Sequence, residues 1–456
     1  MPVLPRSLVP AARIALPKRL RPLAAALLAV AVLGAGGAAR AQSLKELYEA
    51  ARQYDAAYLA AQAQSRSADY RVAQAEGVAR PTASLAGTAN MARIDPPVGG
   101  GGDSNSIGAT VRARYPIINR ANEAQIASAR RSLEVARADL DTAEQDLMVR
   151  VAQAYFDVLA SQDTLGTVRA NKTAITEQLA SAKRNFEVGT ATITDTREAQ
   201  ARFDKAVADE IAAENDLRSK RIALDQLVGR TGITPKPLAV PVALPPVLPA
   251  DAEAWVNTAD AQHPSVRRAR VALDLARIEI DRAKAAERYT LDAVGAVGAT
   301  RTSGSTLSSF GGVTRSAQVG VEFNMPLYTG GVTGARIQET VVLEEKARQD
   351  LEAARRGIAQ GTRVAYFGVV SGQAQVKALE AAEASGKLAL EATQLGYRVG
   401  VRVNLDVLNA QTQLFSTRRD LAKARYDVLV GSLKLRQASG QLKPEDVAAL
   451  NQLLAR

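Results

Sequence analysis

Hydrophobic residues between Ala121 and Val188 recur at alternating steps of three and four positions. This spacing places apolar side chains along one side of an α-helix, as in the seam of a coiled coil. The segment has no proline and a single glycine, Gly166. At 1.5 Å per residue, its roughly 67 residues predict a rod of about 100 Å. The seam positions are Leu133, Ala136, Leu140, Ala143, Leu147, Val151, Ala154 and Val158.

A glycine ends this long helix, and a second helical segment follows it. Gly189 tolerates the left-handed conformation in which many helices end, and Asp195 opens the next segment. The same order returns later in the chain, with a break at Gly400 and a new start at Asp406. The sequence therefore predicts two long helical hairpins, at 120–229 and 333–440. Shorter helical segments are expected ahead of each hairpin unit, at 44–78 and 251–288.

The first 41 residues have the order of a secretory signal peptide. Basic residues come first, a Leu/Ala run follows from Leu23 to about Leu33, and Ala39-Arg40-Ala41 forms a small-residue cleavage site. The apolar run is shorter than the roughly 20 residues that span a bilayer, which argues against a membrane anchor. We expect cleavage after Ala41 and export of the mature chain.

Four segments alternate between apolar and polar residues. In residues 316–327, apolar side chains at 317, 319, 321, 323 and 325 alternate with polar or small ones. Such alternation over about 10 residues, with glycine-rich loops between, is typical of transmembrane β-barrel strands. A soluble two-faced sheet has the same alternation, but two such hairpins in an exported chain favour the barrel. The predicted strands are Thr82–Ile94, Ile107–Ile117, Thr290–Thr302 and Ser316–Leu327.

The chain repeats itself at an interval of 211 residues. Ala154-Tyr155-Phe156 returns as Ala365-Tyr366-Phe367, and Gly229 returns as Gly440. The interval is far longer than the units of a stacked solenoid, so we interpret it as a duplicated half-protein. The predicted organisation is a first repeat at 42–234 with a β-hairpin at 82–117, a proline-rich linker at 235–249, a second repeat at 250–440 with a β-hairpin at 290–327, and a tail at 441–456.

The composition of the chain mainly excludes classes of function. The signal peptide holds six basic residues and no acid, so its loss lowers the formal charge from +11 to +5. The mature chain has no cluster of basic and aromatic residues that would indicate nucleic-acid binding. Cysteine is absent, which excludes disulfides and thiolate chemistry. The single histidine, His263, precedes Pro264 and fits a helix entry better than a metal ligand. No carboxylates form a catalytic constellation, so neither an enzyme, a cofactor nor a metal site is expected.

Four strands cannot enclose a channel on their own. An eight-stranded barrel has room only for side chains or one small ligand, and open sheet edges cannot face lipid. Two copies of the chain would give such a filled barrel, whereas three copies give twelve strands with a lumen. The sequence therefore predicts a homotrimer in contact with outer-membrane lipid.

Short motifs mark the passage from strand to long helix: Tyr115-Pro116-Ile117 and Pro326-Leu327-Tyr328. Together with the matched hairpin tips, they make the chain resemble the TolC family of outer-membrane channels over essentially its whole mature length. The resemblance implies a mainly α-helical fold with a membrane β-barrel part. Long helical hairpins of a trimer would form a periplasmic α-barrel, and four strands per chain a shared 12-stranded outer-membrane β-barrel.

The resemblance also implies a gate at the periplasmic tips. Tyr397 and Arg402 would donate to Asp195, and Asp406 would form a ring of three acids across the lumen. Asn409 stands where the best-known member has a second acidic ring, so cation selectivity should be weaker. Taken singly, Asp195 and Asp406 also fit helix starts, where acids are favoured, and Arg402 fits a solvated position. The tip residues implied to dock an adaptor are Val188, Gly189, Thr190, Val399, Gly400 and Val401.

We expect a passive exit duct for type I protein secretion or multidrug efflux. The implied partners are a periplasmic adaptor and an inner-membrane ABC transporter or RND pump. A periplasmic coiled-coil adaptor is the alternative, but it should carry a soluble β-domain and a membrane or lipid anchor. An enzyme on a helical scaffold is the other rival, and it would have to use carboxylate pairs. The pattern does not distinguish drugs, metal ions and secreted proteins as cargo.

Overall fold

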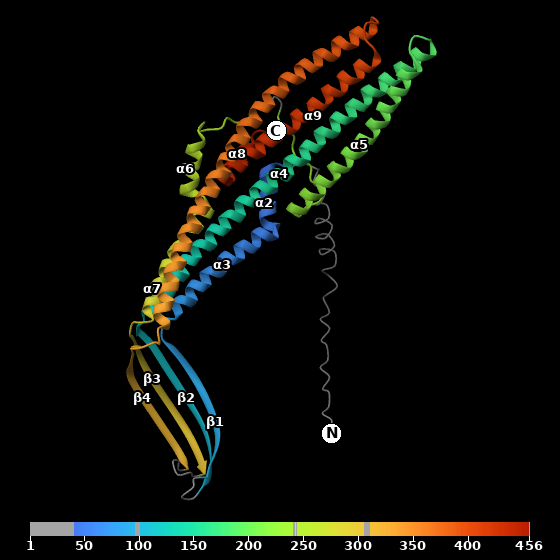
Figure 1. The fold of residues 1–456 in the computed structure, drawn as a ribbon. Coiled ribbons are helices and arrows are strands. Elements are labelled where there is room, and N and C mark those ends of the chain that lie inside the picture. The colour runs from blue at the N-terminus through green and yellow to red at the C-terminus, as the bar shows by residue number, and fades with distance from the viewer. Residues whose placement is uncertain (1–40, 96–100, 240–241, 243, 305–310, 456) are drawn as a thin grey trace, which may run out of the picture.

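The computed structural model describes residues 41–95, 101–239, 242, 244–304 and 311–455. Apart from Ala41, the predicted signal peptide lies outside these residues. The chain forms an elongated molecule with a four-stranded sheet at one end and the tips of two helical hairpins at the other (Figure 1). This arrangement agrees with the fold class expected from the sequence.

Two helices of nearly equal length run through the body of the molecule. They are α4 (Arg120–Glu187, 68 residues) and α8 (Val332–Arg398, 67 residues). Each turns back into a shorter helix, α5 (Ile193–Val228) and α9 (Asn404–Ala438). The start of α4 is capped by Asn119, whose side chain accepts hydrogen bonds from two backbone N–H groups of the first turn. The long helices predicted from the apolar seam are therefore present, with ends within a few residues of those expected.

The two leading helical segments are each broken once, which the sequence analysis did not predict. Asp55 separates the first pair of helices and His263 the second, and each caps the helix that follows it. His263 is thus a helix-entry residue, as expected. A cap side chain satisfies backbone N–H groups that would otherwise lack partners, so the break costs little. The helices are α2 (Leu44–Tyr54), α3 (Ala56–Gly77), α6 (Ala252–Gln262) and α7 (Pro264–Ala285), and α10 (Pro444–Asn451) follows in the tail.

The strands form one antiparallel sheet in the order β1-β2-β3-β4. They are β1 (Thr82–Ile94), β2 (Gly102–Ile118), β3 (Thr290–Gly304) and β4 (Gly312–Asn324). β2 begins five residues before the predicted start, because the polar residues 102–106 pair with the end of β1. β4 ends three residues before the predicted end; Pro326 has no N–H to donate to a neighbouring strand.

The two faces of the sheet differ in polarity. Leu85, Val111, Val297 and Ala317 lie in one row across the four strands, on a face whose apolar side chains are largely exposed in the single chain. The other face carries polar side chains, including an Arg114–Asp292 ion pair with an N–O distance of 2.6 Å. Within the described ranges, no helix is both long enough and apolar enough to cross a membrane.

The main hydrophobic core lies in the middle of the rod, where α2, α4, α5, α9 and α10 meet. Its largest fully buried side chains include Tyr155 and Phe156 of α4 and Leu429 and Leu433 of α9. Burial of such side chains contributes about 1.5–3 kcal/mol each. Because α4 and α9 belong to different hairpins, this core joins the two hairpins into one body.

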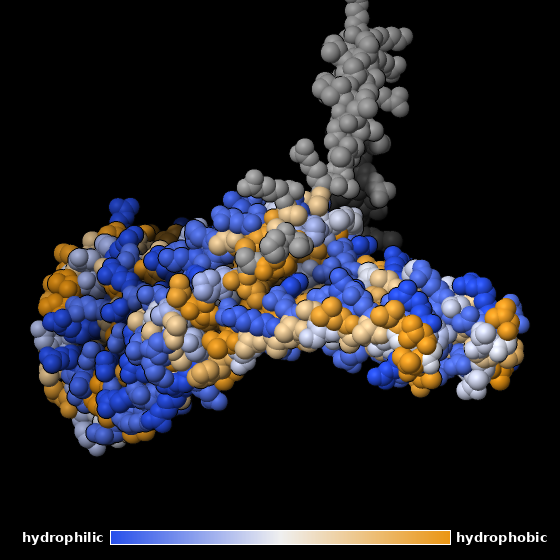
Figure 2. Space-filling view, turned by 90° about the horizontal axis from the view of Figure 1, so that it is seen from above, coloured by the Kyte–Doolittle hydropathy of each residue, from blue (hydrophilic) through white to orange (hydrophobic). Residues whose placement is uncertain are grey.

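Apolar side chains are also present on the surface. Figure 2 shows them gathered in patches between hydrophilic residues on the face seen from above. On α8, Val342, Val364, Phe367 and Leu388 are all more than half exposed. Large apolar side chains exposed at several places along one helix are suited to contact with another molecule.

Candidate functional site

The tips of the two hairpins have the same backbone design. Gly189 (φ 75°) follows α4 and Gly400 (φ 78°) follows α8, and both have the left-handed conformation that glycine adopts without strain. The turns carry exposed apolar side chains, with Val188 at 72% and Val401 at 75% exposure. The residues named for adaptor docking, Val188, Gly189, Thr190, Val399, Gly400 and Val401, are all solvent-exposed.

Asp195 lies in the first turn of α5, which Thr192 caps. Its Oδ2 accepts hydrogen bonds from the backbone N–H of Thr192 (3.0 Å) and from Thr192 Oγ1 (2.7 Å). The N–H of Asp195 donates in return to Thr192 Oγ1 at 3.2 Å. This reciprocal pair is a capping box. Among the described residues, Asp195 has no bond to Tyr397 or Arg402, so the expected links are not formed within one chain.

Tyr397 and Asn409 contact the first hairpin through other residues. The Tyr397 hydroxyl accepts a hydrogen bond from Asn185 Nδ2 at 3.2 Å. Asn409 Oδ1 accepts one from Arg202 Nη2 at 3.0 Å. Asn185 and Arg202 were not identified from the sequence, although they lie 212 and 207 residues from their partners, close to the repeat interval. Pairing across the repeat is the one signal that could have identified them.

Arg402 and Asp406 pair with each other. Arg402 Nη1 lies 3.5 Å from Asp406 Oδ2, one helical turn away and at the surface. An exposed pair of this kind contributes about 0–1 kcal/mol. The second tip therefore neutralises its acid with its own arginine instead of sharing that arginine with Asp195.

An apolar seam lies beneath these polar contacts. Leu408 of α9 is buried against Ile175 and Leu179 of α4 and Ala199 of α5. Asn404, beside it, accepts a hydrogen bond from Gln178 of α4. At the tips, the second hairpin is thus held to the first by one buried leucine and several weak polar links, so separating the tips exposes little apolar surface.

Ion pairs join the two arms of each hairpin. In the first, Arg169 contacts Glu214 (2.6 Å) and Glu210 (3.0 Å), and Lys172 contacts Glu210 (2.7 Å). Hydrogen bonds from Lys172 and then Arg169 lower the pKa of Glu210. Glu210 therefore stays ionised at neutral pH, and the arms of the hairpin are joined along their exposed side.

The two junction prolines lie between the sheet and the long helices. Pro116 pairs with Asp292 near the end of β2, and the register shifts between Pro116 and Ile118. Pro326 lies past the end of β4. Pro116 thus stands at an irregularity in the strand pairing and Pro326 beyond its end, which fits the lack of a backbone donor in proline.

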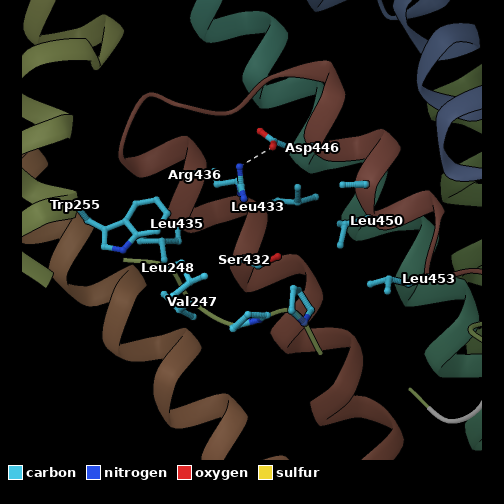
Figure 3. Close-up of a pocket in the computed structure, with 13 residues that line it drawn as sticks. Val247, Leu248, Trp255, Ser432, Leu433, Leu435, Arg436, Asp446, Leu450 and Leu453 are labelled. Carbon is cyan, nitrogen blue, oxygen red and sulfur yellow. Dashed lines mark hydrogen bonds and ion pairs between the residues drawn. The ribbon is translucent and has the colours of Figure 1, made fainter. Parts of the chain in front are cut away.

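An apolar cleft of about 260 Å³ opens in the middle of the rod, between the proline-rich linker, α6, α9 and α10. Trp255 and Leu248 approach it from one side and Leu450 and Leu453 from another (Figure 3). Its charged residues, Arg436 and Asp446, pair with each other at 2.6 Å. In the described part of the chain, no cluster of three histidine or acidic residues could hold a metal ion.

Comparison with known proteins decides the family. The family model described as outer membrane efflux protein matches residues 47–230 and 255–441, two segments that cover most of the chain. The chain belongs to the outer membrane efflux protein family. Its members and structural neighbours are channels, not enzymes, and membership places the chain in the outer membrane.

Individual members of the efflux protein family match over much of their length. Outer membrane protein TolC of Vibrio cholerae is 32% identical over 90% of this chain and 93% of its own. The alkaline protease secretion protein AprF of Pseudomonas aeruginosa is 34% identical over 66% of this chain and 63% of its own. A crystal structure of CusC has a TM-score of 0.77 at 17% identity and covers 88% of this chain and 92% of that one, which confirms the fold.

Proposed function

We propose that three copies of this chain form the outer-membrane exit duct of a tripartite export system. The observation that carries the proposal is the four-stranded sheet with its exposed apolar face. In one chain, β1 and β4 each keep an unpaired edge. Open edges are not stable in lipid, so neighbouring copies would pair β4 of one chain with β1 of the next.

The helices support the same closure. α4 packs against α3, α5, α7 and α9, whereas α8 packs against α6, α7 and α9. This leaves α3 and α5 at one edge of the chain, on the side of β1, and α8 at the other, on the side of β4 (Figure 1). The apolar side chains exposed on α8 would then be covered by the first half of the next protomer. A head-to-tail contact of this kind closes into a ring.

In this proposal the duct is passive and its partners supply the energy. A periplasmic adaptor would meet the exposed valines of the hairpin tips, and an inner-membrane ABC transporter or RND pump would deliver cargo. The names of relatives such as AprF and PrtF, which are protease secretion proteins, support a role in protein export. The name of BepC, an outer membrane efflux protein, supports efflux.

The proposed gate is the set of tip contacts in the periplasm. Tyr397, Arg402, Asp406 and Asn409 would line the constriction, and Asp195 would face it from the first hairpin. The weak links between the tips fit a gate that an adaptor can release, because each exposed link is worth about 1 kcal/mol or less.

Purified protein tests the duct directly. In detergent we expect a trimer, and in planar lipid bilayers we expect discrete conductance steps. A monomer without conductance would contradict the proposed function.

The gate has its own test. Replacing Tyr397 with Phe and Arg402 with Ser together should raise the resting conductance, because the Tyr397 link to Asn185 of the first hairpin is lost and Asp406 is left without its arginine. Arg398→Ser is the matched control, since it removes an arginine one position from Tyr397. An unchanged conductance in the double variant would remove the gate assignment and leave the duct in place.

A further inference from the structure

Two arginines lie beside the exposed face of α9, but only one of them meets an acid. Asp406 and Asn409 are three residues apart and therefore lie on the same side of the helix. Arg402 pairs with the Asp406 carboxylate. Arg202, which reaches across from α5, donates to the Asn409 amide oxygen at 3.0 Å. Within the described ranges, no carboxylate lies within ion-pair distance of Arg202.

An amide accepts a hydrogen bond but does not neutralise a cation. A guanidinium group is a permanent cation in proteins. The layer formed by Arg202, Arg402, Asp406 and Asn409 therefore holds two cations and one anion. Within this layer each chain has one positive charge in excess; Asp195 lies seven residues before Arg202, about two helical turns nearer the tip and outside the layer.

We propose that Arg202 sets the ion preference of the constriction and makes it favour anions. The inference rests on the proposed duct, in which three copies bring three such layers around one lumen. A narrow passage whose lining has a net charge of one sign concentrates ions of the opposite sign by about tenfold or more. Anionic or neutral cargo would enter this constriction readily, and multivalent cations would not be retained there.

The hydrogen bond from Arg202 to Asn409 also ties the two hairpins together, so a latch role and a charge role have to be separated. A latch alters how often the pore opens, whereas charge alters which ions pass. Arg202→Lys keeps the charge and loses the planar fork that positions the hydrogen bond. Arg202→Gln loses the charge and keeps a side-chain donor. The two variants therefore distinguish the roles.

The experiment measures the reversal potential of the full-length protein in planar bilayers across a potassium chloride gradient, and block by lanthanum chloride. The wild type should favour chloride and resist lanthanum. Arg202→Gln should shift the reversal potential toward the potassium equilibrium potential. It should also make the pore about tenfold more sensitive to block by lanthanum. Asn409→Asp should shift it in the same direction, because it adds a carboxylate to the same layer. Arg202→Lys should behave like the wild type.

Arg197→Gln is the matched control. It removes the same charge from an exposed position of α5, five residues before Arg202 and on the other side of the helix. A conducting Arg202→Gln pore with wild-type reversal potential and lanthanum sensitivity would overturn this inference alone, as would an equal shift in Arg197→Gln. A protein that forms no pore would overturn the proposed function, and this inference with it.

Discussion

The two halves of the chain build the same hairpin but surround it differently. On α4, Phe156 is 1% exposed, whereas its counterpart Phe367 on α8 is 57% exposed. Both phenylalanines contact the preceding tyrosine edge to face, with ring centroids 5.5 Å and 5.4 Å apart. The local geometry is therefore duplicated, but α4 has neighbours on both sides and α8 lies at an edge. The position of a helix in the molecule, and not its sequence motif, therefore decides whether its phenylalanine is buried or exposed.

The ion pairs between the arms add a second difference. Arg169 of α4 contacts Glu214 of α5 at 2.6 Å. The positions 211 residues later hold Glu380 of α8 and Arg425 of α9, which contact each other at 2.7 Å. The pair is kept and its charges are exchanged. If α9 took the place of α5 against α4 in the same register, Arg169 would face Arg425. The exchange thus favours pairing within each hairpin.

The largest expected effect separates the two phenylalanines. Phe156→Ala should lower the free energy of unfolding by about 3–5 kcal/mol, because it opens a cavity in the main core. Phe367→Ala should change the free energy of unfolding of the single chain little and instead weaken association in the proposed trimer. Denaturant unfolding at protein concentrations at which the chains are dissociated measures the first effect, and native mass measurement in detergent the second. Equal losses of stability in both variants would contradict the edge position of α8.

Much of the fold follows from the spacing of apolar residues. The three-and-four spacing predicts α4, which contains no proline and a single glycine, and the repeat extends the prediction to α8, which also lacks proline. The breaks at Asp55 and His263 were missed, since the helical pattern continues through them and only the caps mark the interruption. The early start of β2 was missed because residues 102–106 are polar and look like a loop until β1 pairs with them.

The candidate site was less predictable than the fold. The sequence predicts which residues reach the tips, since the turn glycines Gly189 and Gly400 fix where the helices end. It does not predict the partners of polar side chains, because a carboxylate can satisfy a local backbone group as well as a distant cation. Asp195 accepts a hydrogen bond from the nearby backbone N–H of Thr192. Arg202 donates to Asn409 through tertiary packing that no local pattern encodes.

A smaller effect should separate the two tyrosines of the same repeat. The Tyr155 hydroxyl donates to the backbone oxygen of Lys236 at 2.9 Å, and burial raises the pKa of Tyr155. Tyr155→Phe removes this link between α4 and the start of the linker and leaves a carbonyl with one partner fewer, at a cost of about 1–3 kcal/mol. For Tyr366, no hydrogen bond of its hydroxyl occurs among the described residues, so Tyr366→Phe should be nearly neutral. Thermal unfolding of both variants checks the difference, and a loss in Tyr366→Phe as large as in Tyr155→Phe would refute it.

The two capped breaks should respond to pH in a fixed order. His263 Nδ1 accepts from the N–H of Ser265 at 3.1 Å, and Asp55 Oδ1 accepts from the N–H of Tyr58 at 2.8 Å. Burial lowers the pKa of His263, and the hydrogen bond from Arg150 lowers the pKa of Asp55. Each cap therefore acts in its deprotonated form. The stabilisation by each cap is complete above the pKa that its side chain has in the unfolded chain, which is about 6.5 for histidine and about 3.9 for aspartate. The stabilisation is lost as the pH falls through the lower pKa of the same side chain in the folded protein.

Acidification should accordingly loosen the start of α7 before the start of α3, each by about 1 kcal/mol. Hydrogen exchange at the amides of Ser265 and Tyr58, each divided by its unstructured rate, follows the two caps separately. His263→Asn is the control, because asparagine caps a helix without titrating between pH 4 and 7. Protection of both amides lost at the same pH would show that the caps do not act independently.

The smallest expected effect tests the exchanged charges. Glu380→Arg places two arginines opposite each other on α8 and α9 and should lower stability by about 0.5 kcal/mol, since the pair is partly exposed. Adding Arg425→Glu restores opposite charges in the order used by the first hairpin, and should recover the loss. A double-mutant cycle on denaturant unfolding isolates this coupling, provided that the single variants introduce no new contact. If the double variant is as unstable as the sum of the singles, the two positions do not interact. The charge exchange would then have no part in choosing which helix pairs with which.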